Sequence, residues 1–313
     1  MKKEKKGGSV KGFKRVWKDR ELILLALPAV ILLFLFSYVP MFGLTLAFKR
    51  FDYSKGLFGS PWCGLDNFKF LFLNKATFIR LLRNTVGYYA MFLVQGIICE
   101  VALALAVNEL IYKKWGKFFQ SCMILPTFIS YVAVTYIVSA LLDGDNSLIN
   151  TILQSFDLKP IRFYLEAKYW PMILLLVNVW KQTGYGSVLY LASLSGIDRE
   201  IYESAEVDGA TRWQKIFHIN IPLLAPMICI RMLLSLGGIM NSDTGMFYQV
   251  TKNVGALYPT TQVLDSYVMN AMTSGTDFSM TSAVTFFQSM VGLVLTIVVN
   301  KIVKRFSPES ALF

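Results

Sequence analysis

The sequence has little charge and a single histidine. Charged residues make up 16% of the 313 residues, and the one histidine is His218. So low a content leaves too little polar surface to cover ordinary soluble domains. One histidine excludes a metal site built from several imidazoles, and it excludes a histidine-based catalytic triad elsewhere in the chain. The composition therefore argues against most soluble enzyme classes.

Phosphate-binding and cysteine motifs are also missing. No segment matches GxxxxGK[ST], the loop that cradles phosphates in many nucleotide-binding proteins. The four cysteines have no CxxC spacing, and three lie in apolar segments, which predicts neither a zinc site nor a disulfide framework. We therefore expect this chain to bind no metal and no cofactor. If ATP and Mg²⁺ drive its action, another polypeptide must bind them.

Apolar residues dominate what is present. The set AVILMFWYC accounts for 55% of the chain, and the mean hydropathy is +0.50. A bilayer core requires about 20 apolar residues per helix. The sequence predicts an all-α integral membrane protein with six transmembrane helices and prolines that kink some of them, Pro126 included. The candidate spans lie near 22–48, 84–111, 116–142, 169–195, 223–242 and 281–303.

The basic residues indicate orientation. The net charge is +11, but it sits in short blocks beside apolar runs, which favours a lipid bilayer and not nucleic acid as the partner. Residues 1–21 hold nine Lys and Arg, and the segments assigned to the cytoplasm hold 18 against 11 outside. We expect a basic cytoplasmic segment 1–21, a six-span transmembrane domain 22–306 and a short cytoplasmic tail 307–313, in the cell membrane.

The longest cytoplasmic segment is the loop 196–222. Asp198 can cap a short helix over Arg199–Glu206, and Asp208-Gly209 ends it. Thr211 and Gln214 have the spacing of a capping box for a second helix over Arg212–His218. Gly209 supplies an elbow, through a positive φ or through close approach of another segment.

The loop contains the run Glu203-Ser204-Ala205, with Gly209 six residues after Glu203, Ile219 ten after that glycine and Pro222 three further on. This pattern resembles the EAA signature of ABC importer membrane subunits. Ser204 and Ile221 depart from the usual Ala and Leu, and both changes are conservative. The resemblance implies a type I ABC importer permease fold, in which a cytoplasmic coupling helix docks on a separate ATPase. The residues it assigns to ATPase coupling are Glu203, Ser204, Ala205, Asp208, Gly209, Ile219 and Pro222.

Three further segments look like carbohydrate-type importer permeases: 38–48, 62–68 and 180–182. Together with the loop, they resemble the polysaccharide and complex-oligosaccharide permeases related to the maltose-transporter membrane subunits. The resemblance implies a transport subunit without catalytic activity, and an oligosaccharide as its substrate. The implied partners are a second homologous permease, an ABC ATPase dimer and an extracytoplasmic substrate-binding protein.

A sugar pathway needs hydrogen-bonding groups within the apolar spans. Asn178, Gln182 and Tyr185 share one face of the fourth span, while Ser235 and Asn241 belong to a polar or small stripe on the fifth. We assign these five residues to a substrate pathway. The alternative is that they hold helices together by hydrogen bonds across the interface.

Charged residues within the spans leave other functions open. Glu100 and Lys181 lie deep in their spans, whereas Glu109 and Arg231 are expected at span ends. Lys181 points away from the polar face, and we expect it to pair with a partner chain or a backbone carbonyl. We expect Glu100 to be a buried polar contact or a protonated carboxyl. The alternatives are a proton-coupled secondary carrier that uses Glu100 and Lys181, or an ABC permease for peptides or amino acids.

Overall fold

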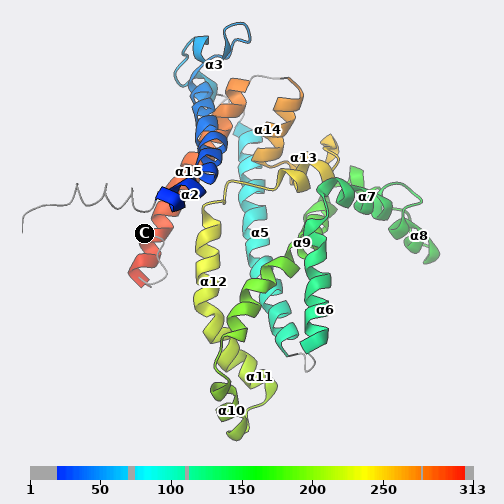
Figure 1. Ribbon diagram of the computed structural model, residues 1–313. Coiled ribbons are helices and arrows are strands. Elements are labelled where there is room, and N and C mark those ends of the chain that lie inside the picture. Colours follow the sequence, from blue (N-terminus) through cyan, green and yellow to red (C-terminus); the bar gives the residue numbers. More distant parts are fainter. Residues whose placement is uncertain (1–19, 70–74, 110–112, 276–277, 307–313) are drawn as a thin grey trace, which may run out of the picture.

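The described residues of the computed structural model, 20–69, 75–109, 113–275 and 278–306, are folded mainly into helices (Figure 1). Within these ranges there is no strand, and one isolated antiparallel bridge joins Lys49 to Trp62. The all-helical architecture expected from the sequence is confirmed. Most of the expected basic segment, residues 1–19, and the tail 307–313 lie outside the described residues.

The helices follow one another with short connections. The longer ones are α2 (Arg20–Leu33), α5 (Lys75–Asn108), α6 (Lys113–Ile124), α7 (Tyr131–Leu142), α9 (Trp170–Ser195), α12 (Ile221–Leu236), α14 (Leu264–Thr273) and α15 (Phe278–Phe306). The shorter α-helices are α3 (Gly56–Gly59), α8 (Leu148–Ser155), α10 (Arg199–Val207), α11 (Arg212–Lys215) and α13 (Tyr258–Thr261). The 3₁₀ and π segments used below are η1 (Phe34–Tyr38), η2 (Val39–Phe48), η4 (Leu125–Phe128), η7 (Ile216–Asn220) and η8 (Gly245–Val250).

Four helices in the described ranges are long and apolar enough to cross a membrane, or five if a bent pair counts as one span. The four are 23–48, 75–108, 212–236 and 278–301. α9 has 26 residues, but Asn178, Lys181 and Gln182 interrupt its apolar sequence, and it is not one of the four. The coarse prediction of a membrane-spanning bundle holds.

The third expected span is not a straight helix. The stretch 118–128 and α7 meet at 96°, so the run 116–142 does not cross as one rod. Pro126 lies at the break; it has no backbone N–H, and its ring clashes with the preceding turn. The kink expected at this proline is therefore a near right-angled turn.

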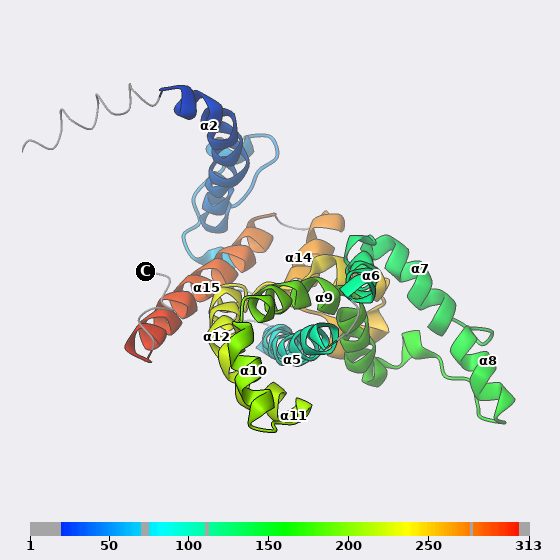
Figure 2. The ribbon, with the colours of Figure 1, turned by 60° about the horizontal axis from the view of Figure 1, so that its bottom comes forward.

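The first helix lies largely outside the body of its own chain. η2 packs against α15, whereas Figure 2 shows α2 standing apart from α15 and from α5 and α9. No residue of its most apolar stretch is buried. Its apolar side chains are left for lipid or for another subunit.

α5 and α9 pack along much of their length and form the centre of the fold. An outer core cluster surrounds Tyr88, Trp170 and Phe247. A second cluster, here called the inner cluster, lies toward α10 and α11, at the lower end in Figure 1. The inner cluster consists of Val101, Ala104, Leu105, Tyr190, Leu194 and Leu224.

Candidate functional site

The loop 196–222 folds into two short helices at the end of the molecule opposite α13 and α14 (Figure 1). α10 begins after Asp198, whose carboxylate accepts a hydrogen bond from the backbone N–H of Glu200 at 3.2 Å. This bond satisfies a donor that the first helical turn cannot pair. The expected first helix is confirmed, with Val207 as its last residue.

Gly209 makes the elbow through its backbone conformation. Its φ is +77°, and a Cβ added there would meet no atom within 4 Å. Within this chain the glycine is therefore required by its positive φ and not by close approach. The N–H of Ala210 donates to the carbonyl of Ala205 at 2.9 Å, which ends α10 in the manner of a left-handed C-terminal cap.

The expected capping box forms at the start of α11. The N–H of Gln214 donates to the Thr211 hydroxyl at 3.4 Å, and the Gln214 side chain accepts the N–H of Thr211 at 2.7 Å. The second helix does not end at His218 as expected. It continues through η7 into α12, so that one helix runs from Arg212 to Leu236.

Two contacts join α10 to the base of this long helix. Lys215 forms an ion pair with Glu206 at 2.8 Å, and the Tyr202 hydroxyl donates to the completely buried side chain of Asn220 at 2.6 Å. The hydrogen bond and the positive charge of Lys215 hold the pKa of Glu206 below its usual 4.5. The pair is therefore charged at neutral pH, and α10 is tied to α12 beyond the elbow.

The residues assigned to ATPase coupling lie mostly at the surface. Glu203, Ser204, Asp208, Gly209 and Pro222 are exposed, while Ala205 and Ile219 are half-buried. Within the described part of the chain, the Glu203 carboxylate makes no ion pair or side-chain hydrogen bond.

The sequence analysis missed three exposed apolar side chains in this loop. Val207 is 88% exposed, and the rings of Trp213 and Phe217 stack with their centroids 6.1 Å apart. The i, i+4 spacing of the two rings on a capped helix could have indicated this patch.

A central cavity of about 310 Å³ lies between α5, α9, α12 and η8. Four of the five residues assigned to the substrate pathway border it: Asn178, Gln182, Ser235 and Asn241. Tyr185 is not among its lining residues and is 63% exposed on α9, so its role stays a prediction. The aromatic contributions come from α5 and η8, which the sequence analysis did not consider, through Tyr88, Tyr89, Phe92 and Phe247.

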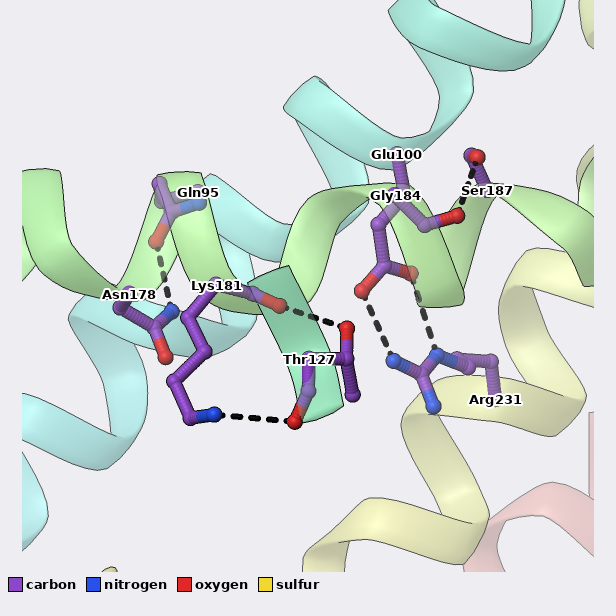
Figure 3. A network of polar contacts seen from close by, with 8 residues as sticks. All are labelled: Gln95, Glu100, Thr127, Asn178, Lys181, Gly184, Ser187 and Arg231. Carbon is purple, nitrogen blue, oxygen red and sulfur yellow. Dashed lines mark hydrogen bonds and ion pairs between the residues drawn. The ribbon is translucent and has the colours of Figure 1, made fainter. Parts of the chain in front are cut away.

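Hydrogen bonds across the cavity connect its helices. The side-chain amide of Asn178 donates to the side-chain oxygen Oε1 of Gln95 at 2.9 Å (Figure 3). The hydroxyls of Tyr89 and Ser235 lie 2.9 Å apart. These bonds support the alternative that the polar groups hold helices together. The same amides keep further donor and acceptor positions, which a ligand rich in hydroxyls can use.

Arg231 was expected at a span boundary, but it borders the central cavity. Its guanidinium binds both carboxylate oxygens of Glu100, at 2.8 Å from Nη2 and 3.3 Å from Nε (Figure 3). Both residues border the central cavity, and the Glu100 side chain is only 4% exposed. Glu100 is thus the buried polar contact expected from the sequence. Its partner is 131 positions away, which spacing arguments within one helix cannot reveal.

Lys181 pairs with backbone carbonyls, one of the two outcomes expected for it. Its ammonium donates to the carbonyl oxygens of Pro126 at 3.2 Å, Thr127 at 2.9 Å and Ile129 (Figure 3 shows Thr127). The Thr127 hydroxyl returns a bond to the carbonyl of Lys181 at 2.7 Å. With Glu100 held by Arg231 and Lys181 by carbonyls, the geometry does not favour a proton relay.

Two glycines of α9 allow this close packing. A Cβ at Gly184 would lie 1.8 Å from the carbonyl oxygen of Met123, and one at Gly186 would lie 2.0 Å from the carboxyl carbon of Glu100. Any other residue at Gly184 would push α9 away from the backbone of Met123, and one at Gly186 would displace the carboxylate of Glu100. This pair was not predicted, although two glycines in an apolar helix are a signal of close helix contact.

Known proteins share this helical architecture. Residues 94–309 match the family described as binding-protein-dependent transport system inner membrane component. The chain belongs to this family of ABC transporter permeases. It is an inner-membrane transport subunit, and its homologues have no catalytic role, so the resemblance drawn from the sequence is confirmed.

Relatives of the chain include Protein LplB of Bacillus subtilis (strain 168), which is 32% identical over 93% of this chain and 91% of its own. The polygalacturonan/rhamnogalacturonan transport system permease protein YteP, from the same organism, is 32% identical over 93% and 90%. A chain of a crystallised bacterial ABC transporter involved in import of the acidic polysaccharide alginate aligns with a TM-score of 0.84. It is 31% identical and covers 95% of this chain and 99% of its own.

Proposed function

We propose that this chain forms half of the translocation pathway of an ATP-driven importer for an oligosaccharide or polysaccharide. The observation that carries the proposal is the central cavity, where amide, hydroxyl and aromatic side chains meet inside an apolar bundle. Saccharides are bound by such combinations of hydrogen-bonding groups and ring faces. The names of YteP and of the alginate transporter support a polysaccharide-derived substrate.

The proposal includes three partners. A second homologous permease would cover the exposed first helix, whose apolar stretch has no buried residue. An ABC ATPase dimer, binding ATP and Mg²⁺, would dock on the loop 196–222 through Glu203 and its neighbours. An extracytoplasmic binding protein would deliver the saccharide, as suggested by the related alginate transporter, which was crystallised with a periplasmic protein carrying an alginate pentasaccharide.

The proposed topology has six spans with both termini in the cytoplasm. α9 would be the fourth span in spite of its polar residues, because Lys181 and Asn178 are paired within the bundle and not exposed to lipid. The excess of Lys and Arg in the segments assigned to the cytoplasm supports this orientation.

The test reconstitutes the chain with its partner permease and ATPase and adds candidate binding proteins. Uptake is measured for oligogalacturonate, rhamnogalacturonan and alginate oligomers, with a peptide mixture and amino acids as comparison. We expect ATP-dependent uptake of at least one saccharide and none by the chain alone. Uptake of peptides or amino acids only would replace the substrate assignment, and ion-driven uptake by the chain alone would contradict the importer assignment.

A further inference from the structure

The long helix from Arg212 to Leu236 connects the loop 196–222 directly to the central cavity. It contains 25 residues, which at about 1.5 Å per residue span roughly 37 Å. Its lower end is tied to α10 by the Lys215–Glu206 ion pair and the Tyr202–Asn220 hydrogen bond. A displacement of α10 therefore reaches the base of α12 through two polar contacts.

Between its base and the cavity, α12 contacts the rest of its own chain through apolar side chains: Leu224 lies in the inner cluster, and Ile221, Met227 and Ile228 pack against it. From Ile221 to Arg231 only Leu224 is buried. An apolar contact of this kind has no preferred direction and lets helices slide. Pro226 lies within the same stretch and weakens the helix, because it cannot donate a backbone hydrogen bond.

The next fixed point is the ion pair between Arg231 and Glu100. Two parallel hydrogen bonds hold the guanidinium against the carboxylate, and such a fork resists both sliding and rotation. The carboxyl of Glu100 also lies against Gly186, where a Cβ would approach it to 2.0 Å. One buried side chain of α5 thus contacts both other helices that line the cavity, α9 and α12 (Figure 3).

We propose that the Glu100–Arg231 ion pair is the joint through which movement of the loop 196–222 reaches the central cavity. It locks α12 to α5 and α9, so that the three helices move as one body. The carboxylate of Glu100 is buried, whereas the Arg231 side chain is 43% exposed. Removing one partner leaves the other charge unpaired, whereas replacing both partners by neutral groups can be tolerated. The proposal rests on the proposed importer function, but the distance measurement that decides it needs no saccharide.

The experiment measures whether α5 and α12 stay together during the ATPase cycle. Spin labels are attached at Cys229 of α12 and at Ile98→Cys of α5, two exposed positions near the joint. The other native cysteines, Cys63, Cys99 and Cys122, are replaced by serine. The label distance is measured by electron–electron resonance in the assembled importer, without nucleotide and after trapping with ATP and vanadate.

In the unaltered complex we expect the same mean distance in both states, within about 2 Å. In Glu100→Gln we expect the distribution to broaden or shift by more than about 5 Å on trapping, and ATP hydrolysis to continue without uptake. Glu100→Gln/Arg231→Gln, which restores a neutral hydrogen-bonded pair, should return the narrow distribution. Asp143→Asn removes the surface ion pair to Lys252 and serves as the matched control, with no change expected.

A distance in Glu100→Gln that is narrow and equal in both states would overturn the proposal. If Glu100→Gln does not assemble, Arg231→Lys, which keeps the charge but loses the fork, takes its place. Failure of both to assemble would show a joint needed for folding alone and would also overturn the proposal. If the importer assignment were wrong, the unaltered complex would show no saccharide uptake, and the distances would still decide the role of the ion pair.

Discussion

Replacement of Gly209 gives a graded test of the elbow between α10 and α11. The residue has a φ of +77° and open space around its missing Cβ, so a substitution costs conformational energy without a clash inside the chain. The left-handed region costs a typical L-residue roughly 1–2 kcal/mol, and asparagine tolerates it best. A β-branched residue has fewer compatible rotamers, so its conformational cost should be at or above the upper end of this range.

These energies determine what fraction of the molecules has the native backbone conformation at residue 209. A cost of about 1–2 kcal/mol lowers an equilibrium constant by a factor of roughly 5–30. We expect Gly209→Asn to bind the ATPase within about three-fold of the unaltered complex, Gly209→Ala roughly 5–30-fold more weakly, and Gly209→Val more weakly still. All three should insert normally, because the loop lies at the end of the bundle.

Titration of labelled ATPase onto the purified permease pair in lipid nanodiscs measures these affinities. Equal binding by Gly209→Val and the unaltered complex would refute a role for the elbow in docking. A loss in Gly209→Asn as large as that in Gly209→Val would refute the conformational reasoning. It would show that the ATPase itself approaches the glycine too closely for any side chain.

Three other substitutions test the loop, the cavity and the helix packing. Glu203→Lys should lower ATPase affinity in the same titration more than Glu200→Lys on the same helix, and equal effects would contradict a specific contact. Asn178→Leu should reduce saccharide uptake but leave complex assembly intact. The lost hydrogen bond to Gln95 is worth only about 0.6 kcal/mol in a membrane protein. Disassembly on size-exclusion chromatography would show a structural role. Gly184→Ala should lower the thermal unfolding midpoint of the complex through overpacking of about 1–3 kcal/mol, whereas Gly87→Ala, with no atom near its added Cβ, should not, and equal midpoints would contradict the packing.

The loop 196–222 was the most predictable region because its signals are local. Asp198, Thr211 and Gln214 act on backbone groups within three residues, so their spacing in the sequence already specifies both caps. The positive φ of Gly209 is also a local signal, because a glycine directly after a helix commonly adopts this conformation. The continuation of α11 into α12 was missed, because His218 and Pro222 suggest a boundary that the first turn of α12 accommodates.

The cavity was predictable only from the helices that supply polar residues. Asn178, Gln182, Ser235 and Asn241 stand out in apolar segments, but Tyr88 and Phe92 look like ordinary core residues in a sequence. The Glu100–Arg231 pair depends on how α5 and α12 are placed in space. No periodicity within either helix contains that information.

The right-angled turn after η4 required a partner from a later segment. The run 116–142 is apolar enough to form one continuous helix, and only Pro126 indicates a break. The break exposes carbonyls that a bilayer cannot satisfy, and Lys181 of α9 satisfies three of them.

The pairing of Lys181 with these carbonyls also has a consequence for the order in which the segments fold during synthesis. When residues 116–142 are synthesised, α9 does not yet exist. The carbonyls of Pro126, Thr127 and Ile129 then have no ammonium group to donate hydrogen bonds to them. A continuous rod is then the conformation that the lipid tolerates, and the turn becomes favourable only after Lys181 arrives. The turn in the third segment therefore depends on the fourth segment being in place.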